Sequence, residues 1–139
     1  MVIVEGLIWP GATATSITIS KQLPLLAPYV PDATGLYPGT INVLFPEGAG
    51  IRITVPDIVT PPLAWRGPGL ASERFAFTKV GFEFPLGNQV IDAWIYTAEQ
   101  SHHRFDMGVV EILARKIDGI VYRQPCKLHL DREAVSLVT

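Results

Sequence analysis

The sequence predicts an all-β protein folded as a closed or nearly closed β-barrel, with a β-sandwich as the alternative. Twelve Pro and twelve Gly divide the 139 residues into short segments. These segments are rich in Val, Ile, Thr and aromatic residues, which favour strands. Signals for long helices are weak. Many short strands separated by turns are typical of barrels and of sandwiches, and periodicity alone does not choose between them.

Most of the predicted strands begin or end next to Gly, Pro or Asn. A tight connection at 85–89, "PLGNQ", joins two of them as a hairpin, because Gly87 and Asn88 can adopt positive φ. In chain order the predicted strands are 2–9, 16–20, 40–45, 51–55, 74–84 and 90–98, then 109–114 and finally 134–138.

Two segments are predicted to lack strands. The stretch 20–30 has a possible N-cap at Ser20, but Pro24 and Pro28 limit a helix there to one or two turns. The stretch 55–73 contains four prolines and two glycines and is predicted to be a loop that crosses one end of the barrel. Within it, "WR" at 65–66 could cover a ligand, although a packed Trp with a solvated Arg is the more common arrangement.

Composition limits the class of protein. The length suits one domain over 1–139, and 48% hydrophobic with 17% charged residues is typical of a globular chain. A net charge of −2 gives no reason to expect nucleic-acid binding. The single Cys126 excludes an internal disulfide and is expected to be a small buried or surface residue and not a nucleophile. The start "MVIVEGLIW" lacks the features of a signal peptide, and no run is long enough to span a membrane, so a cytoplasmic protein is predicted.

The segment "GLYPGTINVLF", 35–45, carries the first candidate site. Thr40 and Asn42 follow a Tyr-Pro-Gly turn and are two residues apart, so on a strand their side chains lie on one face. A hydroxyl and an amide oxygen are hard ligands of the kind that Mg²⁺ accepts together with phosphates and water. From the residues alone, pairing with neighbouring strands or closing the turn is the favoured role for both.

This segment resembles the Tyr-Pro-Gly-Thr-Leu-Asn-Val segment of the CTP-dependent riboflavin kinases of archaeal type. Gly6, Gly11 and Ser20 have the same mutual spacings as the family's first strand, its glycine-rich loop and the Ser that ends the next strand. The stretches "AEQSHHRFDMGVVEILA" (98–114) and "LHLDREAVSLV" (128–138) are similar to later family segments. The resemblance covers nearly the whole chain in order, and its Tyr-Pro-Gly-Thr-x-Asn part is the most specific.

The resemblance implies a six-stranded cradle-loop (RIFT-like) β-barrel with little helix. It also implies a phosphotransferase that moves a phosphate from a nucleoside triphosphate, CTP in the family, to riboflavin to give FMN. Small-molecule substrates are therefore the expected partners, with neither nucleic acid nor membrane. In the family the matching Thr and Asn hold the magnesium ion, which assigns Mg²⁺ to Thr40 and Asn42.

Further roles follow residue by residue. Gly11, Thr13 and Thr15 match the loop that faces the phosphates, and Ser101 and Glu111 match residues that contact the flavin. Glu111 could also orient or deprotonate the attacking hydroxyl. A lone carboxylate in an apolar strand needs exposure, a partner or a ligand, and alternation with Val109 predicts that Glu111 points inward. The adjacent histidines at 102–103 diverge on an extended chain and do not predict a metal site.

Several positions depart from the family pattern. Thr13 and Thr15 stand where the family has glycines, and β-branched residues are unfavourable at positive φ. "ARKIDG" at 114–119 replaces the segment that reads the cytosine base, and the interval 101–111 is two residues longer. These departures predict weak CTP binding. They leave open an alternative function, a catalytically inactive cradle-loop barrel that binds a flavin, a nucleotide or a protein partner.

Overall fold

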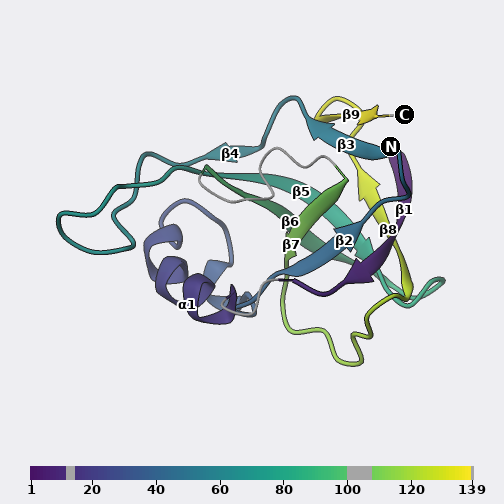
Figure 1. Cartoon of the computed structure of the whole chain (residues 1–139), viewed down its shortest axis with the longest axis horizontal. Helices are drawn as coiled ribbons and strands as arrows, with labels where there is room; N and C mark the ends of the chain where they lie inside the picture. The colour runs from purple at the N-terminus through teal and green to yellow at the C-terminus, as the bar shows by residue number, and fades with distance from the viewer. Residues whose placement is uncertain (12–14, 100–107, 139) are drawn as a thin grey trace.

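The computed structural model describes residues 1–11, 15–99 and 108–138 (Figure 1). In this part of the chain one α-helix and one short 3₁₀ helix accompany the strands. The helices are α1 (Thr15–Leu26) and η1 (Ala33–Gly35). The strands are β1 (Val2–Trp9), β2 (Ile41–Leu44), β3 (Gly50–Ile53), β4 (Ile58–Val59), β5 (Phe75–Glu83), β6 (Val90–Ala98), β7 (Val109–Leu113), β8 (Pro125–Leu130) and β9 (Val135–Val138).

Six strands form a closed ring within one sheet. Their order is β5-β6-β7-β2-β1-β8, and β8 pairs again with β5. Every neighbouring pair is antiparallel. The short β4 pairs with β5 near the start of that strand, at Ala76 and Phe77. The prediction of a mostly β chain is confirmed, and hydrogen bonds around the whole ring distinguish it from two separate sheets facing each other.

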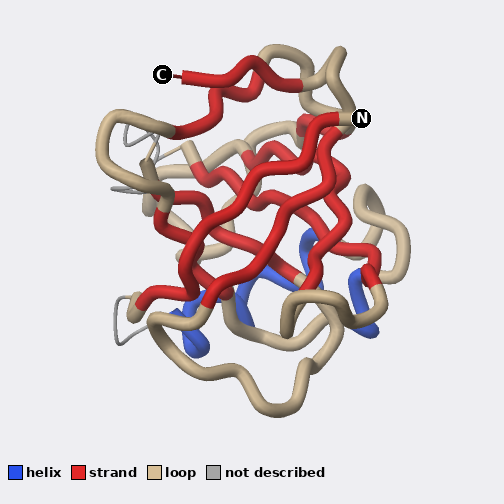
Figure 2. The backbone as a smooth tube through the Cα atoms, turned by 90° about the vertical axis from the view of Figure 1, so that its right-hand side faces the viewer, coloured by secondary structure: helices blue, strands red, loops and turns tan. Residues whose placement is uncertain are grey.

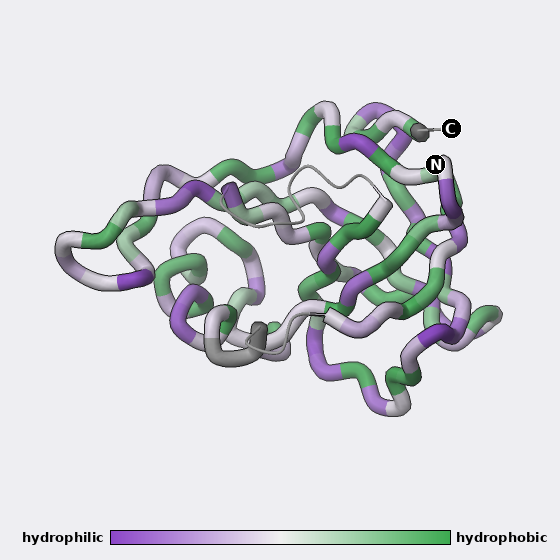
Figure 3. The backbone as a smooth tube through the Cα atoms, viewed as in Figure 1, coloured by the Kyte–Doolittle hydropathy of each residue, from purple (hydrophilic) through white to green (hydrophobic). Residues whose placement is uncertain are grey.

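Apolar side chains fill the inside of the ring. Alternation along the strands sends every second residue inward, and hydrophobic residues recur along the strands (Figure 3). The residues of this inner cluster that come from the ring strands are Ile8, Val43, Val80, Phe82, Ala93, Ile95, Ile112, Cys126, Leu128 and Leu130. Cys126 is buried in this core, which decides between the buried and surface positions that the sequence left open, and burial raises the pKa of its thiol to about 12.

A second, two-stranded sheet closes one end of this core. β3 pairs with β9, and Ile51 and Val135 from these strands are buried in the inner cluster. This pair lies at the end of the molecule that carries both termini, and α1 lies at the opposite end (Figures 1 and 2).

The segment 16–20 is not a strand as predicted but part of α1, and Ser20 lies in the middle of that helix. The helix runs for 12 residues and includes Pro24, which removes one backbone hydrogen bond. Its buried residues Ile19 and Leu26 pack against the outer face of β5 and β6, and such packing outweighs weak local propensity. Pro28 acts as predicted, since α1 ends two residues before it.

The segment 55–73 does not cross an end of the ring. It continues the sheet: β4 pairs with β5, and a further bridge joins Leu63 to Glu73. The result is an arm that extends beyond the ring beside α1 (Figure 1). Leu63 and Trp65 of the arm pack against the same outer cluster as α1.

The hairpin at 85–89 is confirmed, with Gly87 at φ 85° between the paired strands β5 and β6. The strand β8 was not predicted. Its signal is present in "PCKLHL", where Cys126, Leu128 and Leu130 are buried and alternate with more exposed residues. Lys127 and His129 complete a regular alternation, but Pro125 at the start of the segment is unfavourable for a strand interior.

Candidate functional site

Polar side chains form a row across the outer face of the ring, opposite the apolar interior. Asn42 on β2 lies directly across from Glu111 on β7, and Glu111 lies across from Tyr96 on β6. Trp9 on β1 extends the row beyond Asn42. Directly paired residues share a face of a sheet, so four neighbouring strands present these side chains side by side.

Thr40 joins this row from the turn before β2. Its hydroxyl Oγ1 donates a hydrogen bond to Glu111 Oε1 at 3.1 Å. The preceding turn is held by the Gly39 N–H, which donates to the Tyr37 carbonyl at 2.8 Å. The Tyr37 N–H in turn donates to the carbonyl of Ala114 just beyond β7 at 2.8 Å. The Tyr-Pro-Gly turn therefore places Thr40 beside Glu111.

Asn42 is pressed against the chain at Gly11. A Cβ added at Gly11 would lie 1.9 Å from Asn42 Nδ2, so only glycine fits while the amide keeps this position. Asn42 is 5% exposed, and its Oδ1 is buried without a hydrogen-bond partner in the described chain. A buried acceptor without a partner is costly in free energy. This oxygen is therefore suited to a ligand that supplies positive charge or a donor.

Tyr96 and Gln22 connect the row to α1. The buried Tyr96 hydroxyl donates to Gln22 Oε1 at 2.6 Å. Burial, followed by the charge of Glu111, raises the pKa of Tyr96 above its ordinary range, so the hydroxyl stays protonated. The negative charge of Glu111 on β7 thus contributes, after burial, to the raised pKa of Tyr96 on the neighbouring strand β6.

Glu111 points outward and not inward, contrary to the prediction. Val110 and Ile112 pack on the inner cluster, which leaves Glu111 on the opposite face with Tyr96. The prediction failed because β7 is covered on both faces: Leu113, on the same side as Glu111, is buried in the outer cluster. In a strand that is covered on both faces, the alternation of apolar and polar residues does not show which face points to the core.

Of the predicted site residues, the structure brings together Gly11, Thr40, Asn42 and Glu111. Thr15 is the first residue of α1. A residue in a helix has negative φ, so the argument against a β-branched residue does not apply there. Thr13, Ser101 and both histidines of 102–103 lie outside the described residues.

Residues that sequence reasoning missed extend the polar row toward the arm. Glu73 is 1% exposed, accepts a hydrogen bond from Trp65 and forms an ion pair with Arg66. Tyr96, Gln22 and Glu73 each left a weak signal in the sequence, a polar side chain within a stretch that is otherwise apolar or proline-rich. A single polar residue does not reveal a partner that is distant in the chain.

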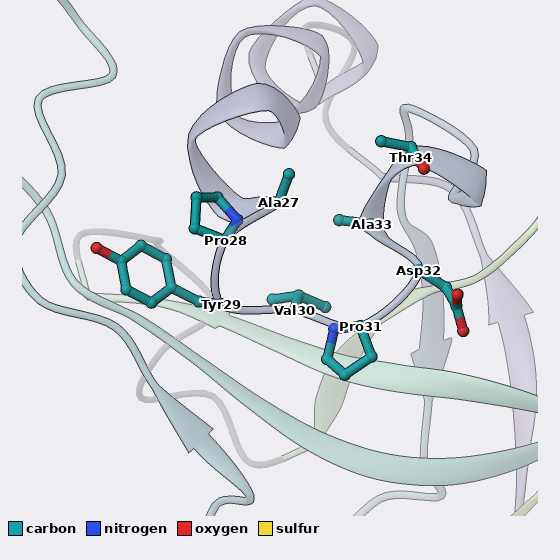
Figure 4. A pocket seen from close by; sticks show the side chains of 8 residues that line it. All are labelled: Ala27, Pro28, Tyr29, Val30, Pro31, Asp32, Ala33 and Thr34. Carbon is teal, nitrogen blue, oxygen red and sulfur yellow. The ribbon is translucent and has the colours of Figure 1, made fainter.

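An open depression of about 350 Å³ lies elsewhere, in the turn that follows α1 (Figure 4). It is lined by the consecutive residues 27–34 and shares none of the predicted site residues. Tyr29, Asp32 and Thr34 carry the side-chain polar groups among its lining residues (Figure 4). No buried polar side chain lines it among the described residues.

Two further features are absent from the described residues. No cluster of three or more His, Cys, Asp or Glu side chains suited to a metal ion occurs there. No helix in the described ranges is both long and apolar enough to cross a membrane. No protein-family model matches the sequence, and no curated protein matches it either.

Proposed function

We propose that this protein is a riboflavin kinase-like phosphotransferase that makes FMN from riboflavin and a nucleoside triphosphate on a cradle-loop β-barrel. The observation that carries the proposal is the contact among Gly11, Thr40, Asn42 and Glu111, which come from three separate parts of the chain. The family resemblance implies that Gly11 faces the phosphates, that Thr40 and Asn42 hold magnesium and that Glu111 contacts the flavin, all within one active site. Their contacts support that assignment.

The oxygen atoms of this group fit a magnesium ion. Thr40 supplies a hydroxyl, Asn42 supplies the buried Oδ1 without a partner, and Glu111 supplies a carboxylate beside them. These are hard oxygen donors, and a set with few protein ligands suits an ion that also holds waters and phosphates. When bound, magnesium would neutralise charge on the phosphates.

The chain's own residues would position the reactants. In the proposed reaction, the 5′-hydroxyl oxygen of riboflavin forms a bond to the terminal phosphorus, and the bond from that phosphorus to the nucleoside diphosphate breaks. Glu111 would orient the hydroxyl and accept its proton. Thr40 holds the carboxylate of Glu111 in place through the 3.1 Å hydrogen bond.

The test is formation of FMN from riboflavin with Mg²⁺ and either CTP or ATP, measured by chromatography. Thr40→Val and Asn42→Ala should each lower turnover roughly 10–100-fold, the range seen when groups that support a metal are removed. Thr54→Val is the matched control, because this exposed hydroxyl just after β3 donates to the Glu133 carbonyl and lies outside the polar row. No FMN with any triphosphate would reject the kinase proposal. Riboflavin binding without turnover would indicate the catalytically inactive binding protein.

A further inference from the structure

The arm beside α1 holds an arginine whose charge is fixed in place but incompletely paired. Arg66 Nη2 lies 3.2 Å from Glu73 Oε1, and the Arg66 guanidinium carbon lies 4.3 Å from the centre of the Trp65 ring. Trp65 Nε1 donates to the same Glu73 oxygen at 2.9 Å. One buried carboxylate therefore fixes both the ring and the guanidinium that rests on it.

The other terminal nitrogen of Arg66 has no acceptor. Arg66 Nη1 is buried and lacks a hydrogen-bond partner in the part of the chain that the structure describes. The Arg66 side chain as a whole is 30% exposed, so this arginine lies at the protein surface although Nη1 itself is buried. An arginine presents its N–H donors in a planar fork that matches the oxygen atoms of a phosphate.

This arginine lies toward the Tyr96 end of the polar row. Trp65, whose ring lies under the Arg66 guanidinium, packs against the outer cluster that contains Tyr96. Strand spacing puts β2 and β6 roughly 10 Å apart across β7. This spacing separates Asn42 from the Tyr96 end of the row, the end at which Trp65 packs.

We propose that Arg66 binds a terminal phosphate group of the ligand, through the Nη1 donor left open by its pairing with Glu73. This inference rests on the proposed function only for the identity of the ligand. The chemistry is shared by two sources, the end of a polyphosphate chain and the 5′-phosphate of FMN. Trp65 and Glu73 act as positioning residues for the guanidinium.

The experiment measures binding of two phosphate probes to the full chain, with riboflavin as the phosphate-free control. Tripolyphosphate with Mg²⁺ is titrated by calorimetry, and FMN and riboflavin are titrated by flavin fluorescence. Arg66→Met should weaken binding of the phosphate probe by roughly 10–100-fold, the range for one charged hydrogen bond, and should leave riboflavin affinity unchanged. Arg66→Lys should lose less, because it keeps the charge without the fork.

Two further variants separate binding from folding. Arg74→Met removes an exposed arginine at the base of the arm and should change phosphate affinity less than twofold. Arg66→Met with Glu73→Gln also removes the charge of the buried carboxylate whose ion pair with Arg66 the single change eliminates. If Arg66 only stabilises the arm, this double variant regains phosphate binding; if Arg66 binds phosphate, it does not.

The outcomes distinguish this inference from the kinase proposal. Tripolyphosphate binding that depends on Arg66, in a protein that binds no flavin, would support the phosphate site and reject the riboflavin kinase. Phosphate affinity within threefold of wild type in Arg66→Met, an equal loss for riboflavin, recovery in the double variant, or no binding of either phosphate probe by the wild type would overturn the role of Arg66.

Discussion

The two faces of the ring differ sharply although the same strands build both. On the inner face, β2, β7 and β6 contribute Val43, Ile112 and Ile95, all of them buried and apolar. One residue away on each strand, the outer face carries Asn42, Glu111 and Tyr96. The inner face is suited to stability, because close-packed apolar side chains leave no polar group to satisfy.

The outer face has the opposite character. Its polar atoms are covered by Gly11, α1 and the arm, and at least two of them, Asn42 Oδ1 and Arg66 Nη1, are buried without partners in the described ranges. Such atoms reduce stability and are retained most often where they meet a ligand. The ring interior is therefore a core, and the proposed ligand site lies on the covered outer surface.

The largest expected effect comes from the inner face. Ile112→Ala should lower the free energy of unfolding by about 2–5 kcal/mol, because it opens a cavity in a fully buried position. Its neighbour Glu111→Gln keeps the side-chain volume and should cost less than about 1.5 kcal/mol while abolishing FMN formation. Urea denaturation measures both. Equal losses of stability in the two variants would contradict the division between faces.

Gly11→Ala tests the contact that joins the loop to the site. The added methyl group collides with the Asn42 amide, so stability should fall by about 1–3 kcal/mol, typical of overpacking. The same change in an Asn42→Ala background should be nearly neutral, since the colliding amide is gone. Thermal unfolding of wild type, the two single variants and the double variant completes this double-mutant cycle. Additive effects on stability would mean that the two residues do not touch.

Tyr96→Phe removes the hydroxyl that bonds to the buried Gln22. The loss should be about 1–2 kcal/mol at neutral pH, because Gln22 Oε1 is left without its donor. The folded state raises the pKa of Tyr96 above the ordinary value of 10.0. Its contribution to stability is therefore complete below pH 10 and declines as the pH rises further.

Urea denaturation at pH 8 and above pH 10 measures this decline. Tyr96→Phe should show a smaller decline than wild type, whereas Tyr122→Phe, which changes an exposed tyrosine, should behave as wild type does. The same decline in all three proteins would show that Tyr96 is not responsible.

The smallest effect is expected at the seam where β8 closes on β5. The Gly87 N–H and then the His129 side chain, at 2.8 Å each, lower the pKa of Glu83 below its ordinary value of 4.5. Glu83 therefore stabilises the fold above about pH 4.5, and this contribution is lost as the pH falls through its lowered pKa. Glu83→Gln should flatten stability across that acidic range, measured against the exposed control Glu47→Gln. If Glu83→Gln loses stability with falling pH as wild type does, Glu83 does not stabilise the seam.

Much of the β structure follows from the sequence alone. Short segments rich in Val, Ile and aromatic residues, separated by Gly and Pro, predict most of the ring strands and the hairpin at Gly87. These signals are local, because strand alternation and turn chemistry depend on a few neighbouring residues. The spacing of Thr40 and Asn42 likewise predicts that both belong to one face.

The tertiary structure decided what local signals leave open. The segment that begins "SITIS" is a helix because the outer face of β5 and β6 offers it an apolar surface, and no local pattern reports that surface. Glu111 faces outward because register with β2 and β6 places it there, in a strand covered on both sides. The contacts of Gly11 with Asn42 and of Arg66 with Glu73 depend on how distant segments pack, and a single sequence carries that information only through the whole fold.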